Sequence, residues 1–357
     1  MHESDPRSRD VTPRSAGTIY RRRERQSWPP DRDFRILSID GGGIRGILPL
    51  AALARLEHQY LGGASIANYF DLVTGTSTGG IIALGLARGL TATEILAIYV
   101  ERGGEVFPPY GRVSRWVRGK LQYFVNRCDT DALYRLIDEV VGPHQVWESG
   151  KRLCIPAAET RHFEPFVFKT PHHPDYRKDW EERMAQVAKT TSAAPAHFRP
   201  AVGSNGYEFI DGGVWANNPL MIGIVDALAC FDIRREQVKA FSLGCGQNRF
   251  EMSNFRRGFG GLLSWTTLLF ETMQIQSANV VGQARLTIGG DRVLRVDLGP
   301  HGKPIELWDW ERARLELPKL GENLIDSLGV LPAEMFLTEP AAPYVSLYTP
   351  SSPPAVR

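Results

Sequence analysis

The sequence predicts an α/β fold in which a mainly parallel central sheet carries a functional site at one edge. Strand-like and helix-like segments alternate from residue 34 to 246, and this order is typical of a parallel sheet whose strands are connected by helices. Glycine-rich turns directly follow two of the strand-like segments, at 40–46 and 75–79. A chain of 357 residues can also bury the large core that such a fold needs.

The individual elements follow from hydrophobic spacing and from helix-start signals. Apolar residues recur near helical spacing in 47–61, and Thr91 or Thr93 and then Asp129 supply helix starts. Short apolar runs bounded by glycine or aspartate predict strands. The expected strands are 34–39, 71–74, 152–158, 166–168, 207–210, 238–243 and 293–296; the expected helices are 47–61, one after residue 77, one from 91 or 93, 129–140, 180–189, 221–229 and 313–328.

Composition and charge narrow the class of protein. Hydrophobic residues make up 43% and charged residues 23%, which is ordinary for a soluble globular protein. A formal net charge of +2 gives no reason to expect a nucleic-acid polymer as partner. No apolar run approaches the roughly 18–20 residues of a membrane span, and the polar, arginine-rich N-terminus lacks a signal core. We therefore expect a cytoplasmic protein whose four cysteines are reduced thiols, with no metal site and no cofactor.

The stretch Gly75-Thr76-Ser77-Thr78-Gly79 lies between an apolar run and a helix-like segment. In such a Gly-x-Ser-x-Gly turn the serine takes a strained backbone geometry, and its hydroxyl projects above the sheet. The flanking glycines are needed because strand and helix pass too close together for a side chain. The stretch therefore predicts a nucleophilic serine, although the pattern alone also fits a simple connecting loop.

A second glycine-rich turn, Asp40 to Gly46, follows the first predicted strand. Its exposed backbone N–H groups suit an anion, which could be a phosphate or a tetrahedral oxyanion. Gly41, Gly43 and Gly46 also match Gly-x-Gly-x-x-Gly, the dinucleotide-binding pattern. That pattern requires an acid at the end of a second strand about twenty residues later. Glu57 falls inside a helix and Asp71 begins a strand, so the dinucleotide interpretation is disfavoured.

Asp211-Gly212-Gly213 closes the predicted strand 207–210, where a carboxylate is well placed to project into a site. A plain Asp-Gly turn is the alternative. His172 and His173 stand near Asp175, but adjacent histidines cannot easily share one face, so we expect a surface loop rather than a metal site.

Three further segments leave alternatives open. Residues 1–33 form a polar arm with a basic cluster at 21–25, expected to be solvated or to touch anionic lipid or a partner. Residues 108–127 alternate basic and apolar side chains, as a membrane-facing lid or a solvated helix would. The apolar residues of 250–281 favour core or subunit contact over a lipid-entry surface. They lie within a C-terminal extension, 247–357, that is expected to pack on the α/β domain, 34–246.

The turns at 40–46, 75–79 and 211–213 together resemble the motifs of the patatin-like phospholipases. Ser192-Ala193-Ala194-Pro195 and Leu243-Gly244-Cys245-Gly246 are also similar to that family, and the resemblance covers roughly 34–246. It implies a three-layer α/β fold and a lipid acyl hydrolase with a serine–aspartate dyad that needs no histidine. It implies Ser77 as nucleophile, Asp211 as proton acceptor, an oxyanion hole from Gly41, Gly42, Gly43, Ile44, Arg45 and Gly46, an elbow of Gly75, Thr76, Thr78 and Gly79, and the glycines Gly212 and Gly213 beside the acid.

The size of the extension resembles bacterial patatin phospholipases that a cyclic dinucleotide activates in antiphage defence. This resemblance implies membrane phospholipid as substrate, a cyclic dinucleotide as activator, and peripheral binding to the inner membrane when the protein is active. It is also compatible with a homo-oligomer. Two other functions stay open at this stage. One is an esterase with a Ser-Asp-His triad, for which His301 is the histidine that follows Asp211. The other is a catalytically silent regulator that binds lipid or nucleotide.

Overall fold

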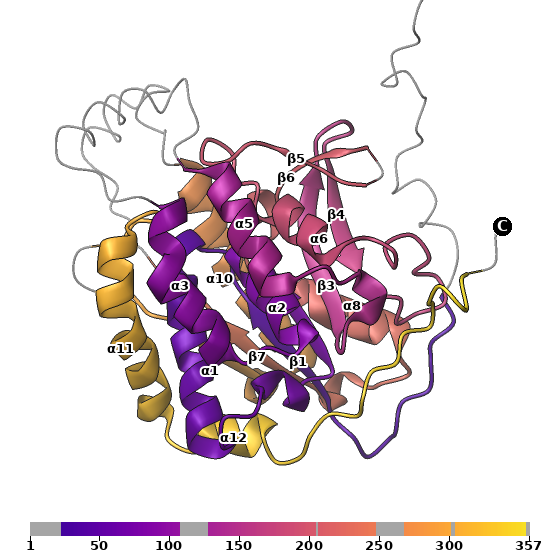
Figure 1. The fold of residues 1–357 in the computed structure, drawn as a ribbon. Helices are drawn as coiled ribbons and strands as arrows, with labels where there is room; N and C mark the ends of the chain where they lie inside the picture. Colours follow the sequence, from indigo (N-terminus) through magenta and orange to yellow (C-terminus); the bar gives the residue numbers. More distant parts are fainter. Residues whose placement is uncertain (1–22, 108–127, 205, 248–267, 301–303, 355–357) are drawn as a thin grey trace, which may run out of the picture.

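A mixed sheet forms the centre of the molecule (Figure 1). The computed structural model describes residues 23–107, 128–204, 206–247, 268–300 and 304–354. Hydrogen-bonded neighbours follow the path β5-β6-β3-β2-β1-β7-β8, and β4 also pairs with β3. The strands are β1 (Phe34–Ile39), β2 (Leu72–Gly75), β3 (Arg152–Glu159), β4 (Glu164–Lys169), β5 (Ala201–Val202), β6 (Glu208–Asp211), β7 (Val238–Leu243) and β8 (Val293–Val296).

The prediction of a mainly parallel sheet is confirmed. The five strands β3, β2, β1, β7 and β8 run parallel, whereas β4, β5 and β6 pair in antiparallel fashion. The helices are α1 (Ile47–Tyr60), α2 (Thr78–Arg88), α3 (Ala92–Val106), α5 (Thr130–Val141), α6 (Met184–Thr191), α7 (Gly213–Ala216), α8 (Leu220–Cys230), α10 (Leu268–Ile288), α11 (Trp310–Leu328) and α12 (Leu331–Phe336).

Helices cover both faces of the sheet, which gives the three layers that the resemblance implies. Successive side chains of a strand point to opposite faces, and β1 follows this rule. Leu37 and Ile39 pack in a cluster with residues of α1, α2 and α5. Phe34 and Ile36 belong to a second cluster with residues of α8. Both faces of β1 are buried, and four of its six residues are apolar; the other two, Arg35 and Ser38, are buried polar residues.

Helix starts were the most predictable boundaries. Thr91 forms a capping box with Glu94 at the start of α3, and Asp129 caps α5 through the N–H groups of Asp131 and Ala132. The prediction of a helix over 180–189 is wrong in its first turn, since α6 begins only at Met184. The carbonyl groups at 180 and 182 instead accept hydrogen bonds from the backbone at 146 and 147.

Both ends of the described chain are joined to the core. Trp28 packs on Phe34 and Phe231, so the described end of the predicted arm, residues 23–33, is attached to the core at Trp28. On the C-terminal side, β8 adds a strand to the central sheet, and Leu317 on α11 packs with Ile47 in a third cluster. The predicted strand at 293–296 is thus confirmed, and it is part of the same sheet as β1.

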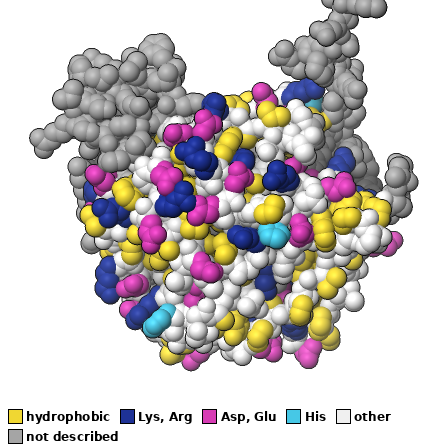
Figure 2. All heavy atoms as spheres, in the orientation of Figure 1, with side chains coloured by type: hydrophobic (Ala, Val, Ile, Leu, Met, Phe, Trp, Pro, Cys, Tyr) yellow, Lys and Arg dark blue, Asp and Glu magenta, His cyan; other side chains and the backbone are white. Residues whose placement is uncertain are grey.

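The surface carries mixed charge. On the face drawn in Figure 2, acidic and basic side chains are interspersed and neither sign dominates, as a net charge of +2 suggests. Within the described residues, no helix combines the length and the apolar character that crossing a membrane requires.

Candidate active site

Ser77 occupies a strained turn between β2 and α2. Its backbone has φ 55° and ψ −123°, a combination that residues with a side chain rarely adopt. A Cβ atom on Gly75 would lie 2.0 Å from the carbonyl oxygen of Gly79, and one on Gly79 would lie 2.3 Å from that of Ile39. The predicted strand–turn–helix arrangement is confirmed, and the steric need for both glycines is visible at these two contacts.

The Ser77 hydroxyl donates a hydrogen bond of 2.6 Å to Oδ2 of Asp211. Asp211 is buried at the end of β6, and its Oδ1 accepts a hydrogen bond of 2.6 Å from the Gly213 N–H group. Burial raises the pKa of Asp211 to about 6, against the effect of the bonds from Ser77 and Gly213. Among the described residues, no histidine bonds to Ser77 or Asp211.

Strand pairing explains why these two side chains meet. β2 pairs with the first part of β3, and this pairing ends where Thr74 lies opposite Cys154. Beyond that point β6 runs antiparallel along β3 and places Asp211 opposite Ala157. Since β4 occupies the other edge of β3, β2 and β6 share one edge almost end to end. The end of β6 therefore lies just above the end of β2, where the Ser77 turn begins.

The glycine loop at 40–46 lies next to this pair. A Cβ atom on Gly41 would be 3.4 Å from Cβ of Ser77. Gly43 has φ 55°, which a side chain would disfavour. Within the described parts of the chain, the N–H groups of Gly42 and Gly43 donate to no protein acceptor, whereas that of Gly41 bonds to the carbonyl of Asn217. Two neighbouring N–H groups are thus available to a ligand oxygen.

The other residues of the implied oxyanion loop have mainly structural surroundings. Ile44 is buried, and its N–H group donates to the carbonyl of Leu307. Arg45 is half-buried, and burial lowers the pKa of its guanidinium. Gly46 lies where a Cβ atom would be 2.5 Å from Oγ1 of Thr78. Thr78 in turn shares a hydrogen bond of 2.8 Å with the Tyr99 hydroxyl.

An apolar pocket opens beside Ser77. Its lining includes Gly43, Ser77 and Thr78, and otherwise it consists mostly of apolar side chains from α2, α3 and α5. The contribution of α5 could have been found in the sequence, because Leu133, Leu136, Ile137 and Val140 follow one helical stripe. The sequence predicts this helix, but not that its apolar stripe faces the site.

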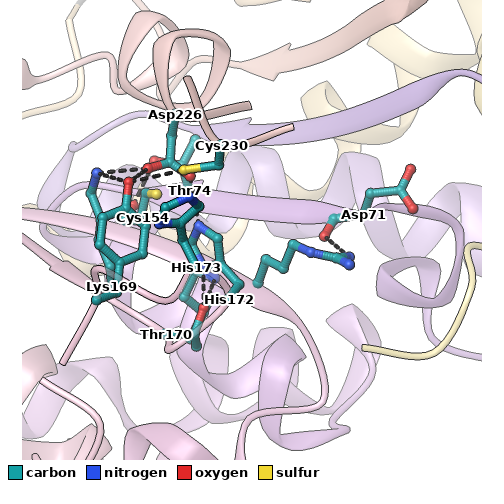
Figure 3. Close-up of polar contacts among 12 residues, drawn as sticks. Asp71, Thr74, Cys154, Lys169, Thr170, His172, His173, Asp226 and Cys230 are labelled. Atoms are coloured by element: carbon teal, nitrogen blue, oxygen red, sulfur yellow. Dashed lines mark hydrogen bonds and ion pairs between the residues drawn. The ribbon is translucent and has the colours of Figure 1, made fainter. Parts of the chain in front are cut away.

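The prediction of a surface loop at His172 and His173 is wrong, because both residues are only 2% exposed. Figure 3 shows His172 beside Asp226, Lys169 and Cys154. His172 Nε2 lies 2.7 Å from Oδ2 of Asp226, and the Lys169 ammonium donates to Oδ1 at 2.6 Å. Asp226 lies on α8, more than fifty residues from the histidines, so no local pattern could reveal this pairing.

The same cluster has the spacing of a metal site. Ligand atoms of Cys154, His172 and Asp226 lie within 4.8 Å of one another. However, Lys169 and the Tyr176 hydroxyl both donate to Asp226, and Lys169 places a positive charge where a cation would bind. We therefore interpret these residues as a buried ion-pair cluster.

Three predicted features lie outside the described residues. They are His301, the lid segment 108–127, and the apolar residues between 250 and 267. Cys154, Cys230 and Cys245 are buried and Cys128 is half-buried, and none of the four forms a disulfide bond within the described structure.

The amino-acid sequence matches one protein family and several of its known members. The model of the family described as patatin-like phospholipase matches residues 37–224. A "cGAMP-activated phospholipase" of Escherichia coli is 34% identical over 242 residues, 61% of this chain and 64% of that protein. One of Vibrio cholerae is 38% identical over 207 residues, 53% of this chain and 56% of that protein.

A third protein of the same name, from Pseudomonas aeruginosa, is 30% identical over 267 residues, 72% of this chain and 76% of that protein. The matches to the first two proteins thus span less than two thirds of their lengths. The family model covers more than half of this chain, including the turns that hold Ser77 and Asp211. The chain belongs to the patatin-like phospholipase family.

Proposed function

We propose that this protein is a serine lipid acyl hydrolase that cleaves acyl esters of membrane phospholipids through Ser77 and Asp211. The observation that carries the proposal is the 2.6 Å hydrogen bond from the strained Ser77 to the buried carboxylate of Asp211. A serine hydroxyl is a weak nucleophile and needs a base within hydrogen-bond reach. Asp211 meets this condition without a histidine.

The reaction proceeds in two halves. Asp211 takes the proton of Ser77 as Oγ attacks the ester carbonyl, and the resulting oxyanion is stabilised by the N–H groups of Gly42 and Gly43. Asp211 then gives the proton to the departing lysophospholipid oxygen, which leaves an acyl group on Ser77. Asp211 next activates water, which attacks the acyl-enzyme and releases a fatty acid and free Ser77.

The apolar pocket supports a lipid substrate. Side chains from α2, α3 and α5 line it, among them Ile81, Val106 and Leu133. An acyl chain next to Ser77 would be removed from water there, and each buried methylene contributes roughly 0.8 kcal/mol. The pocket therefore favours long-chain acyl esters over short polar ones.

We further propose that a cyclic dinucleotide activates the enzyme in antiviral defence, at the cytoplasmic face of the inner membrane. The support is the shared name of three relatives, each called a cGAMP-activated phospholipase. The match to the third covers 76% of that protein, so most of its length has a counterpart here.

The test is fatty-acid release from mixed phospholipid vesicles by the wild type, Ser77→Ala, Asp211→Asn and His301→Ala, each with and without cGAMP. We expect Ser77→Ala and Asp211→Asn to lose at least about 10³-fold in rate, as nucleophile and base variants of other serine hydrolases do. His301→Ala is the control and should retain most of the activity.

The alternatives predict other outcomes. A loss of similar size in a folded His301→Ala protein would favour a histidine triad over the dyad. Tight cGAMP binding without release of fatty acid from any vesicle would favour the silent regulator. Equal release by wild type and Ser77→Ala would refute the proposed nucleophile.

A further inference from the structure

Arg295 lies on β8, two strands away from the strand that leads into the glycine loop. The register aligns Ser38 of β1, Ser242 of β7 and Arg295 in one row. Side chains at the same level of neighbouring strands point to the same face of a sheet. The small serines leave space in which the long arginine side chain crosses toward β1, and its Nη1 donates to Oγ of Ser242 at 2.8 Å.

The Arg295 guanidinium pairs with Asp40 through both of its terminal nitrogens. Nη1 lies 2.9 Å from Oδ1 of Asp40, and Nη2 lies 2.7 Å from Oδ2. The two side chains are 11% and 4% exposed. A bidentate ion pair fixes both the distance and the plane of the carboxylate. It therefore holds Asp40 in place, and Asp40 is the residue directly before Gly41 at the start of the glycine loop. Ser277 of α10 adds a third bond, of 3.0 Å, to Oδ2 of Asp40.

The same guanidinium reaches a second loop. Its Nη2 donates to Oδ2 of Asp297 at 2.8 Å, and Oδ1 of Asp297 accepts the Gly246 N–H at 2.9 Å. The neighbouring Cys245 packs directly behind Gly42, where a Cβ atom would lie 2.3 Å from Cβ of Cys245. Arg295 therefore connects two loops. One is the glycine loop, 40–46, whose Gly42 and Gly43 N–H groups face no protein acceptor among the described residues; the other is the loop after β7, which packs behind Gly42 through Cys245.

Charge makes Arg295 difficult to replace. Asp40 and Asp297 are both almost buried, and both form an ion pair with Arg295. Burial raises the pKa of Asp40, the charge of Arg295 opposes that rise, and the charge of Asp297 adds to it. Without Arg295, two buried carboxylates would face each other next to the glycine loop, and one of them would have to move or take up a proton.

We propose that Arg295 is a positioning residue that holds the glycine loop in the shape required to bind the reaction's oxyanion. In the described structure its hydrogen bonds go to Asp40, Ser242, Ser277 and Asp297, and it does not line the apolar pocket. The inference rests on the proposed role of the Gly42 and Gly43 N–H groups. It assigns a task in the reaction to a residue beyond the stretch 37–224 that the family model matches.

The test compares Arg295→Gln and Arg295→Lys with a control, Arg292→Gln. Arg292 is also an arginine of an ion pair, three residues earlier, but its partners are Asp33 and the exposed Asp291. Two measurements are made on the full chain, with and without cGAMP. One is hydrogen exchange of peptides covering 40–46. The other is steady-state hydrolysis of a soluble acyl ester, which gives KM and kcat. The kcat is expressed per active site, and the active sites are counted by titrating Ser77 to completion with a fluorophosphonate.

For Arg295→Gln we expect faster exchange at 40–46 and a kcat per titrated site lower by roughly 10²-fold, the cost of one lost oxyanion donor. The KM should stay within about threefold, because the lost interaction belongs to the transition state. Arg295→Lys keeps the positive charge but cannot make the bidentate pair. Its exchange rate at 40–46 and its kcat per titrated site should therefore lie between those of Arg295→Gln and the wild type. Arg292→Gln should match the wild type in both measurements.

The outcomes separate the two hypotheses. A merely structural role would lower the melting temperature or the number of titratable sites and leave kcat per site unchanged, which would overturn the inference. Unchanged exchange at 40–46 would also overturn it. If wild type and Ser77→Ala hydrolyse the ester equally, the proposed function fails, while the exchange data still decide whether Arg295 holds the loop. If Arg295→Gln does not fold, Arg295→Lys is judged by the same two readouts.

Discussion

Asp211 has the surroundings of a base that works near neutral pH. Its carboxylate is buried, and among the described residues only Ser77 and Gly213 stabilise its charge, each through a short hydrogen bond. Burial therefore dominates and raises the pKa to about 6. A carboxylate with this pKa binds a proton more readily than an ordinary aspartate and still loses it at pH 7.

The first prediction concerns the pH dependence of the reaction. Only the ionised form of Asp211 can accept the Ser77 proton, so kcat/KM should be constant above about pH 7 and fall about tenfold per unit below about pH 6. The measurement is hydrolysis of a soluble ester between pH 4.5 and 8, on protein shown to stay folded. A fall that begins only near pH 4 would contradict the proposed environment of Asp211.

At this scale the sequence predicted residue types better than their partners. Gly-x-Ser-x-Gly and Asp-Gly-Gly identified Ser77 and Asp211 because each motif is local and each answers a backbone requirement. Their mutual distance depends on β6 running antiparallel to β3, which no local pattern encodes. The partner of His172 was missed for the same reason, since Asp226 lies on a distant helix.

Among the elements, the junction of β2 and α2 has the tightest packing at the site. At Gly79 an added methyl group would lie 2.3 Å from one backbone oxygen, of Ile39, and 2.7 Å from another, of Asp40. Neither oxygen is at the end of a flexible side chain. The end of β1 and the start of α2 would have to separate, and Ser77, which directly precedes α2, would move with the helix.

We therefore expect Gly79→Ala to destabilise the protein by about 3 kcal/mol, the upper end of the usual cost of overpacking, and to abolish hydrolysis. Gly282→Ala is the matched control. Gly282 also lies in a helix, α10, but an added Cβ meets no atom within 4 Å, so alanine should stabilise by up to about 1 kcal/mol. Urea unfolding of both variants gives the comparison, and similar free energies of unfolding would refute the steric argument.

Elements were predictable where a cap or a glycine marks their ends. Thr91, Asp129 and the two glycine turns were found in this way. The start of α6 was misplaced because tertiary hydrogen bonds take the carbonyl groups that a helix would use. The strand at 293–296 was expected, but its place next to β7 in the central sheet was not, since strand order depends on contacts far apart in the sequence.

For the molecule as a whole, the cluster around Asp226 joins distant parts of the chain. Lys169 comes from β4 and Asp226 from α8, while Arg23 near the N-terminal end of the described chain donates to the Tyr176 hydroxyl at 2.6 Å. The charge of Lys169, together with the hydrogen bonds from Lys169 and His172, holds the pKa of the buried Asp226 well below its usual range. One cluster thus fixes a hairpin, a helix and the N-terminal segment against the face of the sheet opposite α2.

We expect Lys169→Met to destabilise the protein by about 3–5 kcal/mol, because it leaves the Asp226 carboxylate buried without its ammonium partner. The double variant with Asp226→Leu removes both charges and should recover a large part of this loss. Chemical denaturation of the wild type, the two single variants and the double variant measures the coupling. Additive losses would contradict a buried ion pair. Lys189→Met, in a pair whose acid is 52% exposed, is the control and should cost less than about 1 kcal/mol.

The central position of β1 has a consequence for how the protein is made. Residues 34–39 pair on one side with 72–75 and on the other with 238–243. A ribosome delivers these strands in order, so β1 lacks one neighbour until more than two hundred further residues have been synthesised. Contacts at such separation form late in folding. A nascent chain that has not yet reached residue 211 can contain Ser77 but has neither Asp211 nor a complete sheet. By the proposed mechanism, such a chain cannot attack the membranes of the cell that is producing it.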